Sequence, residues 1–126
     1  MDLKRLTEAF GPSGCENEVR RMLREAAEKL CDDVSVDRFG NLVCRKRGRD
    51  RALPSVAVAA HMDEIGFIVT GHTEDGLLRF RPVGGVDPRV LVSKWVVLGP
   101  ERLPGVIGAL AIHLQSAADR EKVLGF

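Results

Sequence analysis

The chain has 126 residues, with 19 basic and 18 acidic side chains and a formal net charge of +1. This length fits one domain, or one domain and part of another. A charge so close to neutral argues against nucleic acid or an anionic membrane as a partner. No run approaches the roughly 18 apolar residues of a membrane span, and the N-terminus lacks the apolar core of a secretory signal. We therefore expect a cytoplasmic protein.

The cysteines favour no metal knuckle and no disulfide framework. Cys15, Cys31 and Cys44 are odd in number, widely spaced and without a CxxC pair. A zinc knuckle needs closer spacing. We expect three reduced, partly buried thiols.

The first residues predict two helices. Residues 3–10 are predicted to form a short helix that ends at Gly11-Pro12. Ser13 is the predicted N-cap of the second helix, and Glu16 stands three residues later, where a capping box places its acid. Apolar residues then recur at 3.6-residue spacing, which predicts one buried stripe. The stripe consists of Val19, Met22, Leu23, Ala26, Ala27 and Leu30.

A hairpin and a buried strand are predicted next. Residues 34–44 alternate around a turn at Phe39-Gly40-Asn41. The basic run 46–51 has no interleaved aromatic residue for base stacking, so we interpret it as a solvated loop rather than a nucleic-acid patch. Residues 55–60 are small or β-branched and apolar, which is typical of a strand buried on both faces at the centre of an α/β sheet.

From Gly66 onward, short apolar runs alternate with turn signals. The runs are residues 67–70, 77–80, 90–92, 95–98 and 106–112. Many short strands at this spacing predict a small β-barrel or sandwich. Ser116 is the predicted start of a brief helix toward Leu124. We therefore place a boundary near residues 67–71, with an α/β piece before it and a β module after it.

The candidate chemistry lies at His61 and Asp63, directly after the predicted buried strand. Side chains two residues apart in a strand point to the same face, and ligands gather at the carboxyl ends of strands in open α/β sheets. A neutral imidazole there can bind a divalent metal while the carboxylate fixes its ring. The same spacing also fits a purely structural His–Asp pair, so the spacing alone leaves both interpretations open.

Other polar residues are weaker candidates. His72 falls at a predicted turn, where we expect it to be solvent-exposed, and His113 follows an apolar run that favours a structural or interface role. Glu64 is expected to form hydrogen bonds near the strand end. Catalytic zinc normally has three protein ligands, so these residues do not predict a complete hydrolytic site.

Four separated parts of the sequence resemble the motifs of one known family in order and spacing. They are LTEAFGPSG at 6–14, DRFGNL at 37–42, AHMDEIGF at 60–67, and GGVDPRVL at 84–91 with PGVIG at 104–108 and His113-Leu114. The family is the tetrahedral-type glutamyl/deblocking aminopeptidases, co-catalytic di-metal peptidases of which some members carry endoglucanase labels. The resemblance covers essentially the whole chain.

The resemblance implies an α/β fold in which residues 1–68 are the N-terminal piece of a di-metal aminopeptidase catalytic domain. Residues 69–126 would be a small inserted β-barrel-like dimerisation domain. His61 corresponds to the first metal ligand, and Asp63 to the catalytic-site acid that orients it. The family's other ligands would follow Phe126: a bridging Asp, two adjacent Glu, another acid and a final His.

The resemblance therefore implies a metal-dependent aminopeptidase that removes N-terminal residues from peptides and forms homo-oligomers. The full enzyme would hold two divalent metals, zinc or cobalt, and this chain would be a truncated and inactive portion. Whether this portion alone binds metal is left open. The alternative is a non-catalytic oligomerisation or peptide-binding module derived from the family, with an RNA-binding β-barrel as a third and more distant interpretation.

Overall fold

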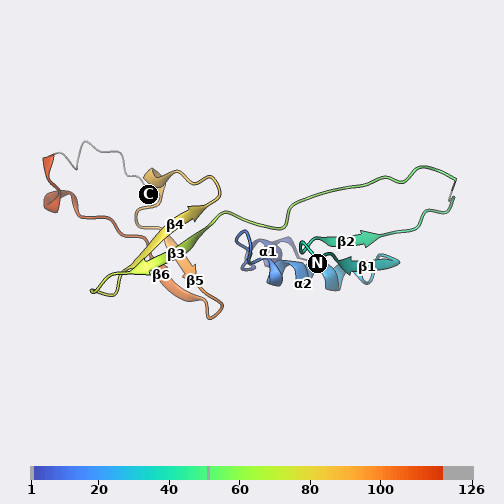
Figure 1. Ribbon diagram of the computed structural model, residues 1–126, viewed down its shortest axis with the longest axis horizontal. Coiled ribbons are helices and arrows are strands. Elements are labelled where there is room, and N and C mark those ends of the chain that lie inside the picture. Colours follow the sequence, from blue (N-terminus) through green and yellow to red (C-terminus); the bar gives the residue numbers. More distant parts are fainter. Residues whose placement is uncertain (1, 51, 118–126) are drawn as a thin grey trace. The chain divides into compact units, whose positions relative to one another are not determined.

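The computed structural model describes residues 2–50 and 52–117. The chain divides into two compact units, Met1–Glu64 and Ile65–Phe126 (Figure 1). This division falls a few residues before the expected boundary between 68 and 69. The predicted helix from Ser116 toward Leu124 lies mostly outside the described residues.

Two helices, α1 (Leu3–Thr7) and α2 (Asn17–Ala27), begin the first unit. The residue before α2 is Glu16, whose side chain makes no capping hydrogen bond. The predicted capping box is therefore wrong. The Ser13 hydroxyl donates instead to the carboxylate of Asp63, 50 residues away in the sequence. A contact that distant in the sequence overrides the local helix-start signal.

Helix α2 carries the predicted apolar stripe. Its buried and half-buried members are Val19, Met22, Leu23, Ala26 and Ala27. Leu30 lies beyond the helix and is 68% exposed, so the stripe ends earlier than predicted. Exposed ion pairs between side chains four residues apart, such as Arg21–Glu25 at 2.9 Å, lie along the helix. Pairs of this kind contribute only about 0.3–0.5 kcal/mol, so burial of the stripe is the main stabilising contribution.

The predicted hairpin is confirmed as β1 (Asp33–Val36) paired antiparallel with β2 (Leu42–Arg45). The carboxylate of Asp37 closes its turn by accepting hydrogen bonds from the backbone amide of Asn41 at 2.9 Å and from its side-chain amide at 2.8 Å. Gly40 has a φ of 87°, a left-handed conformation that glycine adopts without steric cost. Strand β2 contacts α2, so the hairpin packs on the helix.

The segment between the hairpin and His61 differs from its prediction. Residues 46–50 form an exposed loop, as expected. The predicted strand at 55–60 is wrong, because these residues form no strand, and Val56 and Val58 are 90% and 94% exposed. A strand buried on both faces needs neighbouring strands, and no described strand pairs with this segment.

The second unit is built from two antiparallel hairpins. Strand β3 (Gly66–His72) pairs with β4 (Leu78–Val83), and β5 (Trp95–Leu98) pairs with β6 (Leu103–Val106). Among the described residues the two hairpins do not share a hydrogen-bonded sheet, so these strands do not close into a barrel.

Two predicted strands are wrong, and 3₁₀ turns lie beside or within them. The run 90–92 begins at the last residue of the turn Pro88–Val90. The run 106–112 begins at the last residue of β6 and ends at the first residue of the turn Ile112–Leu114. The first turn is capped by Asp87, whose carboxylate accepts from the Arg89 amide at 3.0 Å. Short apolar runs do not distinguish strands from other structure by periodicity alone. The Asp-Pro pair before the first run was the signal for a capped turn.

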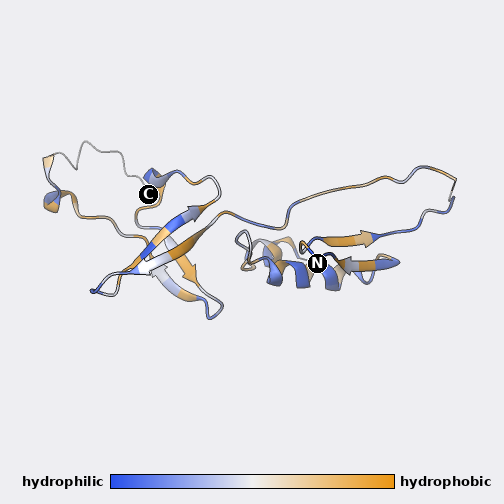
Figure 2. Ribbon diagram, in the orientation of Figure 1, coloured by the Kyte–Doolittle hydropathy of each residue, from blue (hydrophilic) through white to orange (hydrophobic). Residues whose placement is uncertain are grey.

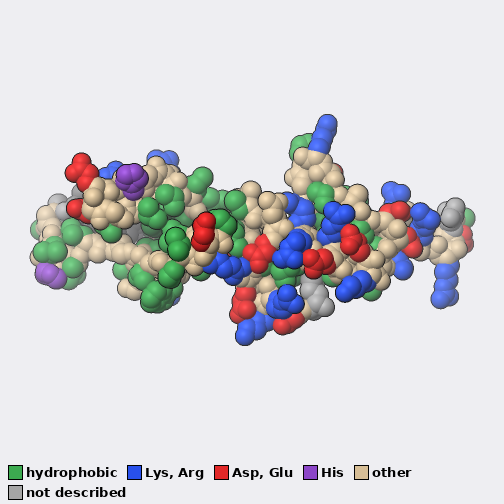
Figure 3. All heavy atoms as spheres, turned by 90° about the horizontal axis from the view of Figure 1, so that it is seen from below, with side chains coloured by type: hydrophobic (Ala, Val, Ile, Leu, Met, Phe, Trp, Pro, Cys, Tyr) green, Lys and Arg blue, Asp and Glu red, His purple; other side chains and the backbone are tan. Residues whose placement is uncertain are grey.

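Neither unit buries much apolar surface. The buried apolar residues in the described part of the chain are Ala9, Val19, Leu91 and Ile107. Large apolar side chains are exposed on both units, and Figure 2 shows hydrophobic residues along strands β2 and β5. In the space-filling view, hydrophobic side chains gather over the hairpins of the second unit (Figure 3). No helix in the described ranges has the length and apolar character needed to span a membrane.

Candidate metal site

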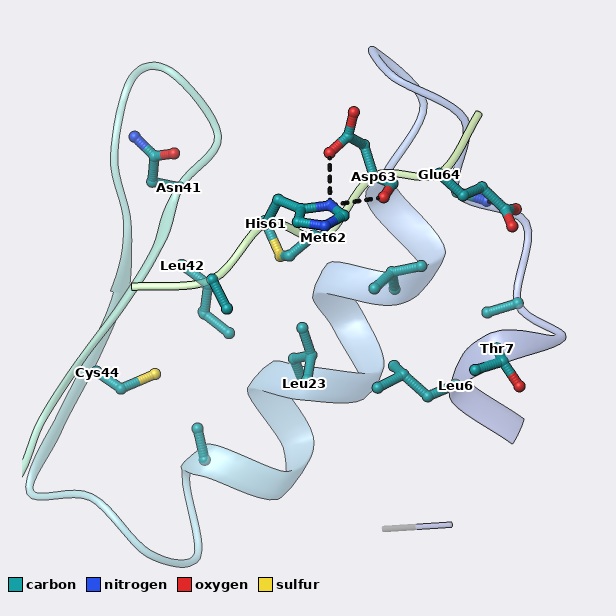
Figure 4. A pocket seen from close by; sticks show the side chains of 15 residues that line it. Leu6, Thr7, Leu23, Asn41, Leu42, Cys44, His61, Met62, Asp63 and Glu64 are labelled. Carbon is teal, nitrogen blue, oxygen red and sulfur yellow. Dashed lines mark hydrogen bonds and ion pairs between the residues drawn. The ribbon is translucent and has the colours of Figure 1, made fainter. Parts of the chain in front are cut away.

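The segment from His61 to Glu64 lies at the end of the first unit, beside the loop that joins α1 to α2 (Figure 4). It borders a pocket of about 550 Å³. Apolar side chains of Leu6, Val19, Leu23 and Leu42 form much of the wall, and His61, Asp63 and Glu64 supply polar groups. Helix α2 and the β1–β2 hairpin therefore provide an apolar wall beside the candidate residues.

The structure brings His61 and Asp63 together. His61 Nδ1 lies 2.9 Å from the backbone oxygen of Asp63 and 3.0 Å from its carboxylate Oδ1. Both partners are acceptors, so Nδ1 carries the proton and donates it. In the described part of the chain Nε2 makes no hydrogen bond, and its lone pair is available. Metal-binding histidines use this arrangement, with one nitrogen held by a carboxylate or carbonyl and the other on the metal.

The carboxylate of Asp63 is held in its ionised form. The Ser13 hydroxyl donates to Oδ2 at 2.5 Å, and this hydrogen bond, followed by the one from His61, lowers the pKa of Asp63. Half of the carboxylate therefore faces the serine and half faces the imidazole. An ionised Asp63 can only accept, which fixes the direction of the hydrogen bond from His61.

Backbone contacts join the same two segments. The Glu64 amide donates to the Gly11 carbonyl at 2.9 Å, and the Gly11 amide donates to Glu64 Oε1 at 3.3 Å. Pro12 and Glu64 also form an isolated parallel β-bridge. The prediction that Glu64 forms hydrogen bonds near this point is confirmed, although its partner is the loop before α2 rather than a sheet.

Sequence reasoning missed Gly11 and Ser13 as residues of this site. The sequence pattern indicates Ser13 only as a helix cap, although this serine lies in the motif LTEAFGPSG. A signal that Ser13 belongs to the site was present, because its motif and AHMDEIGF both resemble motifs of one family. Two family motifs far apart in sequence commonly meet in space, and here they meet through the Ser13–Asp63 hydrogen bond.

The described residues fit a metal at one position only. His61 offers Nε2, while Asp63 and Glu64 are engaged by the hydrogen bonds above. Across 2–50 and 52–117, no group of three or more His, Cys, Asp or Glu side chains gathers to hold a metal ion. His72 ends β3 and His113 lies in the second 3₁₀ turn. Among the described residues His61 thus offers one free donor nitrogen, fewer than the three protein ligands of a catalytic zinc.

Comparison with known proteins identifies the family. A family model described as M42 glutamyl aminopeptidase matches residues 40–125, more than half of the chain. This chain belongs to the M42 family. The resemblance drawn from its motifs is confirmed. The M42 chain is also similar to a putative aminopeptidase, FrvX, of Escherichia coli K12. The two are 36% identical over 127 residues, which cover 98% of this chain and 35% of the relative.

Solved structures agree in fold with this M42 chain. The TET aminopeptidase of Thaumarchaeota archaeon SCGC AB-539-E09 matches with a TM-score of 0.87 and 36% identity, over 98% of this chain and 34% of that one. The TET1 peptidase of Pyrococcus horikoshii, which can assemble into a tetrahedron or a large octahedral shell, matches with a TM-score of 0.78 and 39% identity, over 98% and 36%. The chain therefore spans about a third of the length of these relatives.

Proposed function

We propose that this M42 chain supplies part of the active site of a metal-dependent aminopeptidase that removes N-terminal residues from peptides. His61 is a metal ligand through Nε2, and Asp63 is the residue that positions it. The observation that carries this proposal is the fixed tautomer of His61, whose Nδ1 faces only acceptors and whose Nε2 has no partner in the described part of the chain. Similarity to aminopeptidases over nearly the whole chain supports the same function.

The chemistry follows from that geometry. When bound, the two divalent metals of the site, zinc or cobalt, supply an activated water and polarise the scissile carbonyl. The role of this chain is to present one neutral imidazole nitrogen with its lone pair free. The ionised Asp63 keeps the proton on the other nitrogen and fixes the orientation of the ring.

Catalysis belongs, in this proposal, to a longer polypeptide. The chain spans about a third of its relatives, and His61 is a single ligand where a two-metal site needs several. Residues 1–68 are then part of the catalytic domain, and residues 69–126 an inserted β-barrel-like domain. The two antiparallel hairpins support the β character of the second assignment. The cysteines, none of them in a disulfide, support a reducing compartment such as the cytoplasm.

The test is release of N-terminal residues from unblocked peptides by the product of the complete reading frame that contains this chain. We expect activity that a chelator removes and that zinc or cobalt restores. His61→Ala should lower kcat by more than about 100-fold, since even residues that only support a ligand commonly cost 10- to 100-fold. His72→Ala is the matched control and should leave kcat unchanged. Chelator-resistant hydrolysis, or full activity of His61→Ala, would overturn the proposal. The 126-residue chain alone should show no turnover.

A second candidate function is self-association. Trp95 and Val97 on β5 are 77% and 53% exposed, and the hairpin edges of the second unit are unpaired among the described residues. A related TET1 peptidase can assemble into closed shells. Sedimentation of the purified chain should therefore show a homo-oligomer whose population rises with concentration. A strict monomer at high concentration would count against this function.

A further inference from the structure

We infer that Ser13 is a positioning residue for His61, acting through Asp63 and held in place by the Gly11–Glu64 backbone contacts. This inference rests on the proposed role of His61 as a metal ligand and adds a residue to that site. The contacts form a clasp between two segments, residues 11–13 and residues 61–64. We call these two segments, with the hydrogen bonds that join them, the clasp.

The two oxygens of Asp63 have different partners. Oδ2 accepts from Ser13 at 2.5 Å, and Oδ1 accepts from His61 Nδ1 at 3.0 Å. A carboxylate that is bonded at one oxygen cannot rotate freely. The serine therefore determines which way the second oxygen points. That oxygen, together with the Asp63 backbone oxygen 2.9 Å from Nδ1, determines which imidazole nitrogen carries the proton.

Exposure explains why a second contact is needed. The side chain of His61 is 84% exposed and that of Asp63 is 40% exposed. An exposed pair of this kind is weak by itself, because water competes for both groups and the side chains lose rotational freedom. A carboxylate fixed from its other side loses less freedom when it binds the imidazole. Preorganisation of this kind sets the geometry of a ligand before the metal arrives.

Ser13 is in turn placed by a buried part of the unit. The Glu64 amide donates to the Gly11 carbonyl at 2.9 Å, and the Gly11 amide donates back to Glu64 Oε1 at 3.3 Å. A Cβ added at Gly11 would lie 2.6 Å from Val19 Cγ2. Val19 is 6% exposed and belongs to the apolar stripe of α2. The clasp thus rests on the most firmly packed side chain of the helix.

The competing interpretation is that Ser13 only joins two loops and has no influence on the imidazole. The two interpretations predict different tautomers of His61 when the hydroxyl is removed. If Ser13 only joins loops, the Nδ1–H tautomer persists in Ser13→Ala. If Ser13 positions Asp63, the carboxylate turns toward water and Nδ1 keeps only the Asp63 backbone oxygen as an acceptor. The ring then relaxes to a mixture in which the share of the Nε2–H tautomer is larger than in the wild type. An effect on folding alone does not move the tautomer ratio of a chain that remains folded.

The experiment is a ring-nitrogen NMR measurement on this 126-residue chain without metal, at a pH at which the imidazole is neutral. We expect the wild type to show His61 with the proton on Nδ1, and Ser13→Ala to show a mixture. Ser13→Thr keeps the hydroxyl and should match the wild type. Ser55→Ala is the matched control, because the Ser55 side chain is exposed and makes no hydrogen bond in the described part of the chain. Backbone amide shifts of Gly11 and Glu64 report whether the clasp remains folded.

The tautomer of His61 in Ser13→Ala distinguishes the two interpretations. A folded Ser13→Ala chain with the wild-type tautomer would overturn the inference. If Ser13→Ala does not fold, Ser13→Cys decides, since it keeps the size of serine and offers only a weak donor. We expect a mixture there, and a wild-type tautomer would overturn the inference. Zinc affinity at His61 should fall by about 10- to 100-fold in Ser13→Ala. The tautomer is measured without metal or peptide, so an absence of peptidase activity would not affect this result.

Discussion

Gly11 shows how single atoms constrain the site at the scale of the residue. A methyl group at this position would lie 2.6 Å from Val19 Cγ2 and 3.7 Å from the Met62 carbonyl oxygen. The first distance is too short for any real contact, and Val19 is buried, so the loop rather than the helix has to move. Its movement would displace the carbonyl that accepts from the Glu64 amide.

Gly11→Ala should therefore destabilise the first unit by about 1–3 kcal/mol, the usual cost of overpacking. Urea unfolding followed by circular dichroism measures the difference. Gly48→Ala is the matched control, because a Cβ there meets only the Asp50 carbonyl oxygen at an ordinary 3.6 Å. The control should change stability by less than about 0.5 kcal/mol. Equal effects of the two substitutions would contradict the close packing at Gly11.

Asp37 provides a pH-dependent contact in the β1–β2 turn. The side-chain hydrogen bond from Asn41, followed by those from backbone amides, lowers the pKa of its carboxyl group. A folded pKa below the unfolded one means that the turn gains stability above the unfolded pKa. That gain is lost as the pH falls through the folded pKa.

Asn41→Ala removes the side-chain donor and keeps the backbone amide. The pKa of Asp37 should rise toward the ordinary value of an aspartate, and the acid loss of turn stability should begin at a higher pH. Carboxyl-carbon NMR shifts recorded against pH measure this. Asp87, whose pKa is lowered by Arg89 in the second unit, is the internal control and should titrate unchanged. An unaltered Asp37 titration would show that the Asn41 side chain does not hold the carboxylate.

At the scale of the element, helices and hairpins set by nearby residues were predicted correctly more often than those that depend on contacts far along the chain. Helix α2 and the β1–β2 hairpin follow from apolar spacing and turn residues, which act within a few positions. The start of α2 did not follow, because Ser13 bonds Asp63 rather than its own helix. The apolar run 55–60 has strand composition, yet a strand forms only with a partner, and no described strand lies beside it. His61 and Asp63 were predictable as a pair; the serine that holds them was not.

The β3–β4 hairpin is stabilised by an aromatic pair. The rings of Phe67 and Phe80 meet edge to face, with centroids 4.9 Å apart and an interplanar angle of 71°. The register places Phe80 opposite Val69, so the two rings are diagonal neighbours across the strands. Diagonal aromatic pairs of this kind reach across a hairpin and add to its stability.

Phe67→Leu should cost the β3–β4 hairpin about 1 kcal/mol, the size of an edge-to-face contact beyond simple burial. Amide hydrogen exchange measures this loss of stability: exchange in β3 and β4 should become faster, and exchange in β1 and β2 should not change. Ile68→Leu is the matched control on the same strand, since Ile68 is 57% exposed and should tolerate the change. Equal acceleration by both substitutions would mean that the ring pair adds nothing specific.

At the scale of the whole molecule, the chain corresponds to about a third of an M42 relative and buries little apolar surface among its described residues. It matches solved TET peptidases with TM-scores of 0.87 and 0.78 while spanning about a third of their length. Its buried apolar residues are few among those described, and its exposed ones include Trp95 and Ile112 at 77% and 70%. The family could be predicted from four separated motifs. The exposure of residues 55–60 could not, because burial depends on surfaces that these residues do not supply.

Zinc titration of the chain, followed at the ring nitrogens of its three histidines, decides whether His61 is the metal ligand. The oxygens of Asp63 hold the Nδ1 side of the His61 ring, and Nε2 has no partner in the described part of the chain. Within the described ranges, His72 makes a single long contact, 3.4 Å between Nδ1 and the backbone oxygen of Thr73. We expect the Nε2 signal of His61 to shift at the lowest zinc concentration, with His72 and His113 following only at higher ones. If the signals of His72 or His113 shifted at a lower zinc concentration than those of His61, or if zinc bound Nδ1 of His61, the metal-ligand role of His61 would be contradicted.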